Sequence, residues 1–121
     1  MQLKSAIIGL LFISTSSLHA GMPDDIGKIQ STWAIARYQT SSDLQETAFE
    51  NLVEEARELA ADYPDQAEPK VWLAICLSTD AGVNGGFDAL GKVKEAKRLL
   101  DAAEEIDPGV LNGSVYTSLG S

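Results

Sequence analysis

Apolar residues in this chain recur every three or four positions in four successive segments, which is the spacing of amphipathic α-helices. The first segment starts near Ile26, the second follows the cap-forming residues 40–43, the third spans about 68–78 and the fourth about 92–106. No segment alternates apolar and polar residues with a period of two. We therefore predict an all-α fold of antiparallel helix hairpins without a sheet.

The predicted helices differ in how much surface they bury. The second is the most clearly amphipathic and is ended by Tyr63 and Pro64. The third is apolar nearly all round between Val71 and Leu77, so we expect it to be the most buried. The fourth is expected to turn these residues inward: Val93, Ala96, Leu99, Leu100, Ala103 and Ile106.

A glycine-rich segment over residues 80–91 separates the third and fourth predicted helices. Its glycine content predicts that neither helix continues through it, because glycine costs about 1 kcal/mol relative to alanine in a helix interior. We expect a flexible connector that exposes polar and aromatic side chains. Its candidate interaction residues are Asp80, Asn84, Phe87 and Asp88.

Two prolines share a register with the aromatic residues that follow them. Trp72 comes eight residues after Pro64, and Tyr116 comes eight residues after Pro108. Each proline ends one predicted helix and each aromatic residue falls in the first turns of the next, so the chain contains a repeated unit.

The repeated unit also matches a known pattern. Ala96, Leu100 and Pro108 fit A-x3-F…P, with leucine in place of phenylalanine. The W-x2-L-G half of the same pattern is fitted by Tyr116, Leu119 and Gly120, and more loosely by Trp72, Ile75 and Cys76 and by Trp33 and Ala36. The sequence thus resembles the tetratricopeptide-repeat (TPR) family over about residues 28–121, although its spacings of 39 and 44 residues exceed the usual value of about 34.

The resemblance implies helix hairpins stacked as a short right-handed solenoid, in which the third repeat is only begun. Small residues let paired helices approach, and aromatic residues fill the gap between repeats. The residues expected to pack in this way are Trp33, Tyr63, Pro64, Trp72, Ala96, Leu100, Ala103, Pro108, Tyr116, Leu119 and Gly120.

The first twenty residues have the layout of a secretory signal peptide. Lys4 is followed by a short apolar core at residues 6–13, a polar stretch and Ala20, after which cleavage is expected. Residues 21–27 are expected to be a flexible lead-in. Several segments carry a narrower resemblance: YPD at 63–65, W-x2-I-x2-ST at 72–79, the glycine-rich insertion, VKEAKRLLDAA-x-EIDP at 93–108 and YTSLG at 116–120. In these the chain is similar to exported proteobacterial TPR proteins and, more distantly, to the helical periplasmic component of tripartite ATP-independent transporters. We therefore expect a periplasmic or secreted protein.

The residue inventory argues against nucleic-acid binding and against common catalytic sites. The chain has 9 basic and 18 acidic residues; without residues 1–20 it loses Lys4 and carries a net charge of −10, which repels phosphate backbones. The only histidine, His19, lies in the signal segment, and Cys76 is the only cysteine. The G-x4-G-K match at residues 86–92 is followed by Val93, where a phosphate-binding loop needs serine or threonine. We expect no catalytic activity, cofactor or metal.

The charges of the fourth predicted helix run against its dipole. Its first half carries Lys92, Lys94, Lys97 and Arg98, and its end carries Asp101, Glu104, Glu105 and Asp107. The dipole favours the reverse order by about 0.3–1 kcal/mol for each charge near an end. Contacts with a neighbouring repeat or with a partner are expected to compensate.

The leading functional hypothesis is a protein–protein interaction scaffold or adaptor whose paired helices form a concave surface for a protein or peptide partner. The alternative is a small-ligand-binding accessory of a periplasmic transport system, with the glycine-rich segment and Trp72 forming a pocket. Because repeats bury their faces only against neighbours, the edge bearing Tyr116 and Leu119 is expected to be covered in a homo-oligomer or continued in a longer chain.

Overall fold

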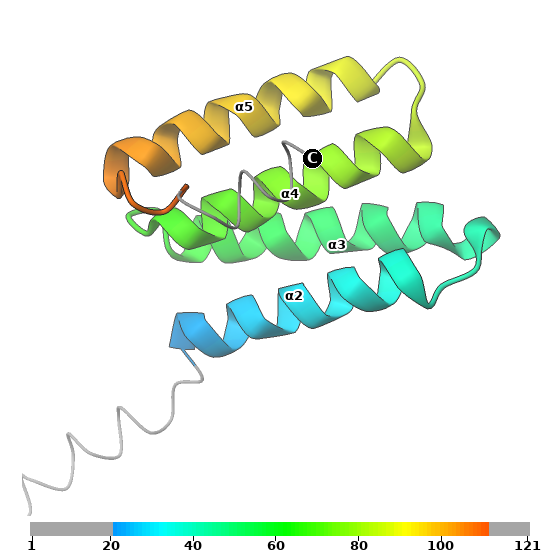
Figure 1. Ribbon diagram of the computed structural model, residues 1–121, viewed down its shortest axis with the longest axis horizontal. Coiled ribbons are helices and arrows are strands. Elements are labelled where there is room, and N and C mark those ends of the chain that lie inside the picture. Colours follow the sequence, from blue (N-terminus) through cyan, green and yellow to red (C-terminus); the bar gives the residue numbers. More distant parts are fainter. Residues whose placement is uncertain (1–20, 112–121) are drawn as a thin grey trace, which may run out of the picture.

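The computed structural model describes residues 21–111 and shows four α-helices (Figure 1). They are α2 (Gly21–Tyr38), α3 (Ser42–Asp62), α4 (Ala67–Asn84) and α5 (Ala89–Ile106). Successive helices run in opposite directions, so the α2–α3 and α4–α5 connections lie at the same end of the molecule (Figure 1). The predicted all-α fold is confirmed for these residues, which contain no strand. The expected signal peptide and the segment from residue 112 onward lie outside the described residues.

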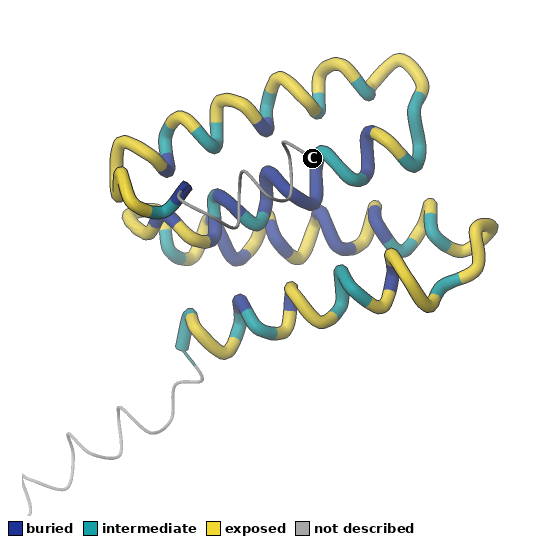
Figure 2. Tube along the Cα trace, viewed as in Figure 1, coloured by how far each residue is buried: buried dark blue, intermediate teal, exposed yellow. Residues whose placement is uncertain are grey.

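Helix α4 is the centre of the fold. Its backbone packs closely against α2, α3 and α5, and no other helix of the described chain packs in this way on all the others. Its trace carries much of the buried colour in Figure 2, and its buried residues are Ala67, Pro69, Val71, Leu73, Ala74, Ile75, Cys76, Leu77, Asp80 and Ala81. The expectation that the third predicted helix is the most buried is confirmed. A helix that is apolar nearly all round can pack on several neighbours at once.

Helix α3 buries the apolar face that its sequence predicts. Its buried residues are Phe49, Leu52, Val53, Ala56, Leu59 and Ala60. The glutamate-rich opposite face is exposed, as in an amphipathic helix at a protein surface.

The turns that contain Pro64 and Pro108 have the same hydrogen-bond pattern. The N–H of Tyr63 donates to the Leu59 carbonyl over 3.1 Å, and the N–H of Gln66 donates back to the Tyr63 carbonyl over 3.1 Å. After α5, the N–H of Asp107 bonds to Ala103 over 2.9 Å and the N–H of Val110 bonds to Asp107 over 2.9 Å. Each proline is thus the second residue of a four-residue turn, a position that its fixed φ suits.

The flexible lead-in expected at residues 21–27 is wrong, because these residues belong to α2. Ile26 is buried and Met22 packs against the core. Pro23 does not prevent the helix, since the first turn needs no N–H from it. Burial of the apolar side chains outweighs the weak local signal.

The extent of the glycine-rich connector is also corrected. Helix α4 continues to Asn84 and α5 begins at Ala89, so only residues 85–88 connect them, instead of 80–91. Packing of Ala81 against the core holds the helix through Gly82. The helix stops at Gly85 and Gly86, whose φ angles of 60° and 79° are unfavourable for other residues.

The inward face expected for the fourth helix is correct only in part. Ala96 and Ala103 of α5 are buried and Leu99 is half-buried, whereas Val93 is 48% exposed and Ile106 is 42% exposed. In the described chain α5 packs closely on α4 alone and reaches α3 only through the Arg57–Glu95 ion pair, which leaves apolar residues on its flanks uncovered.

Candidate interaction site

Two tryptophans join α2 to α4. The ring centroids of Trp33 and Trp72 are 6.4 Å apart at an interplanar angle of 72°, an edge-to-face contact. Trp33 Nε1 donates a hydrogen bond of 3.0 Å to the Thr79 hydroxyl, which in turn donates to the Ile75 carbonyl over 2.8 Å. Both rings are half-buried and pack against both apolar clusters of the core. They therefore fix how the first hairpin lies against α4.

The other residues expected to pack between repeats fall into three groups. Leu100 packs against both apolar clusters and Tyr63 against one. Ala96 and Ala103 are buried, while Pro64 and Pro108 are exposed in their turns. The structure does not describe Tyr116, Leu119 and Gly120, so their packing role stays a prediction.

The four residues expected in one interaction loop separate into two environments. Asp80 lies in α4 and is only 2% exposed, so its expected place in an exposed loop is wrong. Its carboxylate is 3.0 Å from Lys92 Nζ and accepts a hydrogen bond from the Asn84 amide. The same amide donates to the Glu46 carbonyl of α3 over 3.4 Å. Asp80, Asn84 and Lys92 thus tie helices together, and Lys92 is not presented to a phosphate group.

Phe87 and Asp88 remain in the connector. The Phe87 side chain is fully exposed, and Asp88 precedes α5 without a side-chain capping bond. At the same end of the molecule Tyr38 is 72% exposed, its ring contacts Trp33 at 6.0 Å, and the Arg37 guanidinium lies 5.6 Å from its centroid. Exposed aromatic and arginine side chains are enriched in protein interfaces. Sequence analysis missed Arg37 and Tyr38, although an aromatic residue just before the polar 39–43 stretch was a usable signal.

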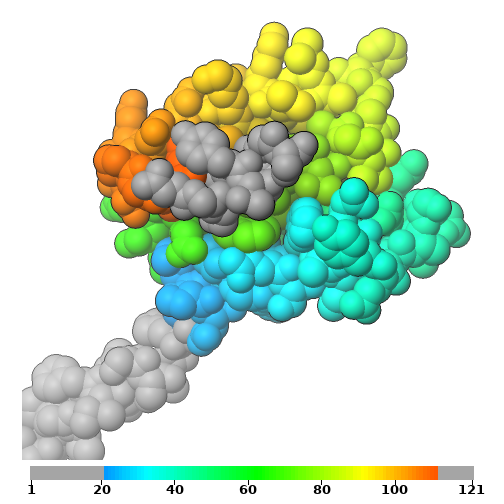
Figure 3. All heavy atoms as spheres, in the orientation of Figure 1, coloured from blue at the N-terminus to red at the C-terminus, as the bar shows by residue number. Residues whose placement is uncertain are grey.

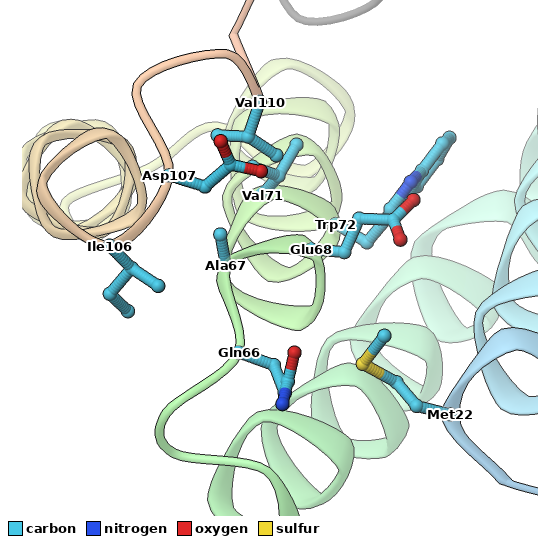
Figure 4. Close-up of a pocket in the computed structure, with 9 residues that line it drawn as sticks. All are labelled: Met22, Gln66, Ala67, Glu68, Val71, Trp72, Ile106, Asp107 and Val110. Carbon is cyan, nitrogen blue, oxygen red and sulfur yellow. The ribbon is translucent and has the colours of Figure 1, made fainter.

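A cavity of ≈ 340 Å³ lies at the opposite end of α4 (Figure 4). The Trp72 ring forms one side, Met22 of α2 lies across from Gln66, and Val110 lies beyond the end of α5. Its lining residues are Met22, Gln66, Ala67, Glu68, Val71, Trp72, Ile106, Asp107 and Val110. The cavity is partly open and its exposed lining is as polar as it is apolar, whereas small-ligand pockets are mostly apolar.

Trp72 and the glycine-rich connector do not line one pocket. Thirteen residues of chain separate Trp72 from Gly85 along α4, which corresponds to about 20 Å at the helical rise. The pocket expected from Trp72 together with residues 80–91 is therefore wrong in its composition, because α4 is longer than the sequence indicated.

A second hollow of ≈ 340 Å³ lies between α2 and α3. Its floor contains Ile29 and Leu59, and its rim has four carboxylates around one lysine: Asp25, Glu55, Glu58 and Asp62 around Lys28. Within residues 21–111 no group of three or more histidine, cysteine or acidic residues has an arrangement that would hold a metal ion. The hollow is an acidic surface feature that the sequence indicated only as charge on a helix face.

Cys76 is not placed for nucleophilic chemistry. Burial in the core raises the pKa of its thiol to about 12, and the nearby charges of Glu55 and Asp80 act in the same direction. The thiol therefore stays protonated at neutral pH, and the thiolate is the reactive form.

Comparisons with protein-family models, with curated proteins and with solved structures found no match to this chain. Among residues 21–111, none of the helices combines the length and the apolar character that crossing a membrane requires.

Proposed function

We propose that this protein is an exported, non-catalytic interaction scaffold built from TPR-like helix hairpins. The observation that supports it best is the equivalence of the Pro64 and Pro108 turns, each of which closes the second helix of a hairpin. The packing of α4 on both helices of the first hairpin gives further support, because stacked repeats bury their faces against their neighbours.

The proposed binding surface for a protein or peptide partner is the end that carries both hairpin connections. Tyr38 and Phe87 are large, exposed aromatic side chains there, and the Asn84–Glu46 hydrogen bond holds the two hairpins together beside them. Aromatic side chains that become buried in a partner supply much of the binding energy in protein interfaces. A concave surface along the paired helices stays a prediction from the sequence.

Site-specific photo-crosslinking in cells of the source organism tests this surface. Benzoylphenylalanine replaces Tyr38 or Phe87 in the whole 121-residue sequence, and replaces Ile106, exposed at the opposite end, as the matched control. We expect a cross-linked polypeptide of the same mass from positions 38 and 87 and not from 106. An equal yield from position 106, or no adduct at 38 and 87, contradicts the proposal.

The cavity beside Trp72 supports a second candidate, a small-ligand-binding accessory of a periplasmic transport system. Because Trp33 and Trp72 are the only tryptophans, the variant Trp33→Phe isolates the emission of Trp72. Saturable quenching or shift of that emission by one class of small polar solutes favours this candidate. A Trp72→Phe variant, in which Trp33 reports, is the control and should respond weakly.

A further inference from the structure

The outer face of α5 carries a stripe of residues at coiled-coil spacing. Leu90, Lys94, Lys97, Asp101 and Glu104 follow one another at intervals of four, three, four and three residues, which places them along one side of the helix. All five are exposed. Most of the α5 trace is exposed in Figure 2, and α5 forms the edge of the molecule opposite to α2 (Figure 3). The stripe is an unpartnered helix face of the described chain.

The charges of this stripe are divided by sign. Lys94 and Lys97 occupy its first half, whereas Asp101 and Glu104 occupy its second half. The first turn of α5 has no acidic residue and its last turn has no basic one, so apart from Asp88 at the N-cap the helix dipole is not complemented at its ends.

The inner charges of α5 are already satisfied within the chain. Lys92 pairs with Asp80, and Glu95 pairs with Arg57 of α3 at 2.6 Å. On the outer face Lys97 lies 3.1 Å from Asp101 in its own helix. Neither Lys94 nor Glu104 has an ion-pair partner among residues 21–111.

We propose that two copies of the protein associate through this stripe, with their α5 helices antiparallel. Lys94 and Glu104 lie five residues on either side of Leu99, and Lys97 and Asp101 lie two residues on either side. A twofold axis on the stripe side of α5, level with position 99, therefore sets Lys94 against the partner subunit's Glu104 and Lys97 against the partner subunit's Asp101. The same register forms every contact twice, as a closed twofold dimer requires.

The antiparallel pairing also accounts for the reversed charge order. In each subunit the basic first half of α5 then lies beside the second half of the partner subunit's α5, which carries the acidic residues and the negative end of the dipole. A parallel pairing sets like charges against each other, and a ligand of one charge complements only half of the stripe. Of these occupants, a second copy is the one that complements the stripe along its whole length.

The dimer is expected to be weak and sensitive to salt. Its contacts are exposed ion pairs with Leu90 and Val93 as the apolar margin, and such pairs contribute little individually and are screened by added ions. The dimer does not depend on the partner surface proposed above, because the two surfaces share no residues. The photo-crosslinking variants at positions 38 and 87 leave the stripe unchanged. Failure of either proposal can therefore be recognised separately.

Sedimentation velocity tests the dimer on protein purified from cells that express the whole 121-residue sequence. At low ionic strength the protein should sediment as a dimer and shift towards monomer as salt is added. Each of the reversals Lys94→Glu and Glu104→Lys should raise the Kd at least about tenfold, because symmetry makes each substitution act at two contacts.

Mixing the two single variants gives the decisive measurement. In the mixed dimer both 94–104 contacts again join opposite charges, so an equimolar mixture should dimerise although neither variant does so alone. Lys28→Glu on α2 changes the net charge by the same amount as Lys94→Glu and is the matched control for that variant, which should dimerise like the original protein. Circular dichroism verifies that each variant retains its helices.

Three results would overturn the proposal: a monomer at concentrations up to about 1 mM at low salt, no recovery in the mixture, or an effect of Lys28→Glu equal to that of the stripe variants.

Discussion

The ammonium group of Lys92 lies 3.0 Å from the carboxylate of Asp80, which is almost completely buried between α4 and α5. This pair spans the short connector and fixes α5 on α4 close to the point where the chain reverses. A charge that is buried in this way depends on its partner, because removing one member leaves the other without compensation.

Replacing Lys92 by methionine should therefore lower the free energy of unfolding by about 2 kcal/mol, since it keeps much of the packing and removes the charge that faces Asp80. Urea unfolding followed by circular dichroism measures the change. Lys97→Met is the matched control, because the Lys97–Asp101 pair is exposed and its loss should cost less than about 0.5 kcal/mol. Equal effects of the two substitutions would contradict the structural role of the buried pair.

The two kinds of glycine around the connector should respond oppositely to alanine. Gly85→Ala and Gly86→Ala should each destabilise the protein by about 1–2 kcal/mol, because alanine is strained at their positive φ angles. Gly82→Ala should stabilise it by about 0.5–1 kcal/mol, because Gly82 is helical and has open space around an added Cβ. Thermal unfolding of the three variants tests this; a stabilised Gly86→Ala variant would refute the connector conformation.

The Trp33–Thr79 hydrogen bond should be detectable by a double-mutant cycle. Trp33→Phe and Thr79→Val each remove one partner, and a coupling energy of about 0.5–1.5 kcal/mol is expected from urea unfolding of the single and double variants. Trp33→Phe with Ser78→Ala is the comparison pair, since Ser78 is the chain neighbour of Thr79. If the Trp33 and Thr79 effects are simply additive, the contact contributes no stability.

At pH 8 the buried thiol of Cys76 should react with Ellman's reagent more slowly in the native protein than after unfolding in urea, by a factor of at least about 100. Its pKa is raised by burial from an ordinary value of 9.0 to about 12, so the folded state disfavours the thiolate. The stability that this difference contributes is complete below pH 9 and is lost as the pH rises from about 9 towards 12.

A Cys76→Ala variant should lack this component of the pH dependence, and comparing its unfolding with that of the original protein at pH 8 and pH 10.5 isolates it. The same slope in both proteins would show that the thiol titrates normally in the folded state.

The helical conformation of α3 and its buried face could be predicted from the sequence, because the spacing of its apolar residues agrees with the packing in the structure. The spacing of Phe49, Leu52, Val53 and Ala56 leaves one apolar face, and α4 covers it. Periodicity is reliable in such a segment because burial and helical geometry select the same residues.

Helix boundaries were less predictable where packing opposes local propensity. Gly82 and Gly86 are the same residue type, yet only Gly86 lies where the chain must adopt a positive φ. Ile26 brings residues 21–27 into α2 although Gly21, Pro23 and Gly27 are poor helix formers. Composition alone does not reveal which side chains find a neighbour.

The candidate interaction surface was predicted only in part, and for a related reason. Phe87 was placed correctly in an exposed connector, whereas Asp80 was wrongly assigned to the same loop. The burial of Asp80 depends on its contacts with Lys92 and Asn84, which the sequence pattern does not reveal. Tyr38 belongs to the candidate interaction surface only because the α2–α3 turn lies at the same end of the molecule as residues 85–88. That arrangement follows from how the four helices are connected in space, which local sequence patterns do not show.

The central position of α4 limits where this chain can change during evolution. The buried positions of α4 face the other three helices, so substitutions there disturb helix packing, whereas the outer faces of α2, α3 and α5 border solvent and can diverge one residue at a time. New binding specificities can thus accumulate on the periphery while a single helix preserves the architecture.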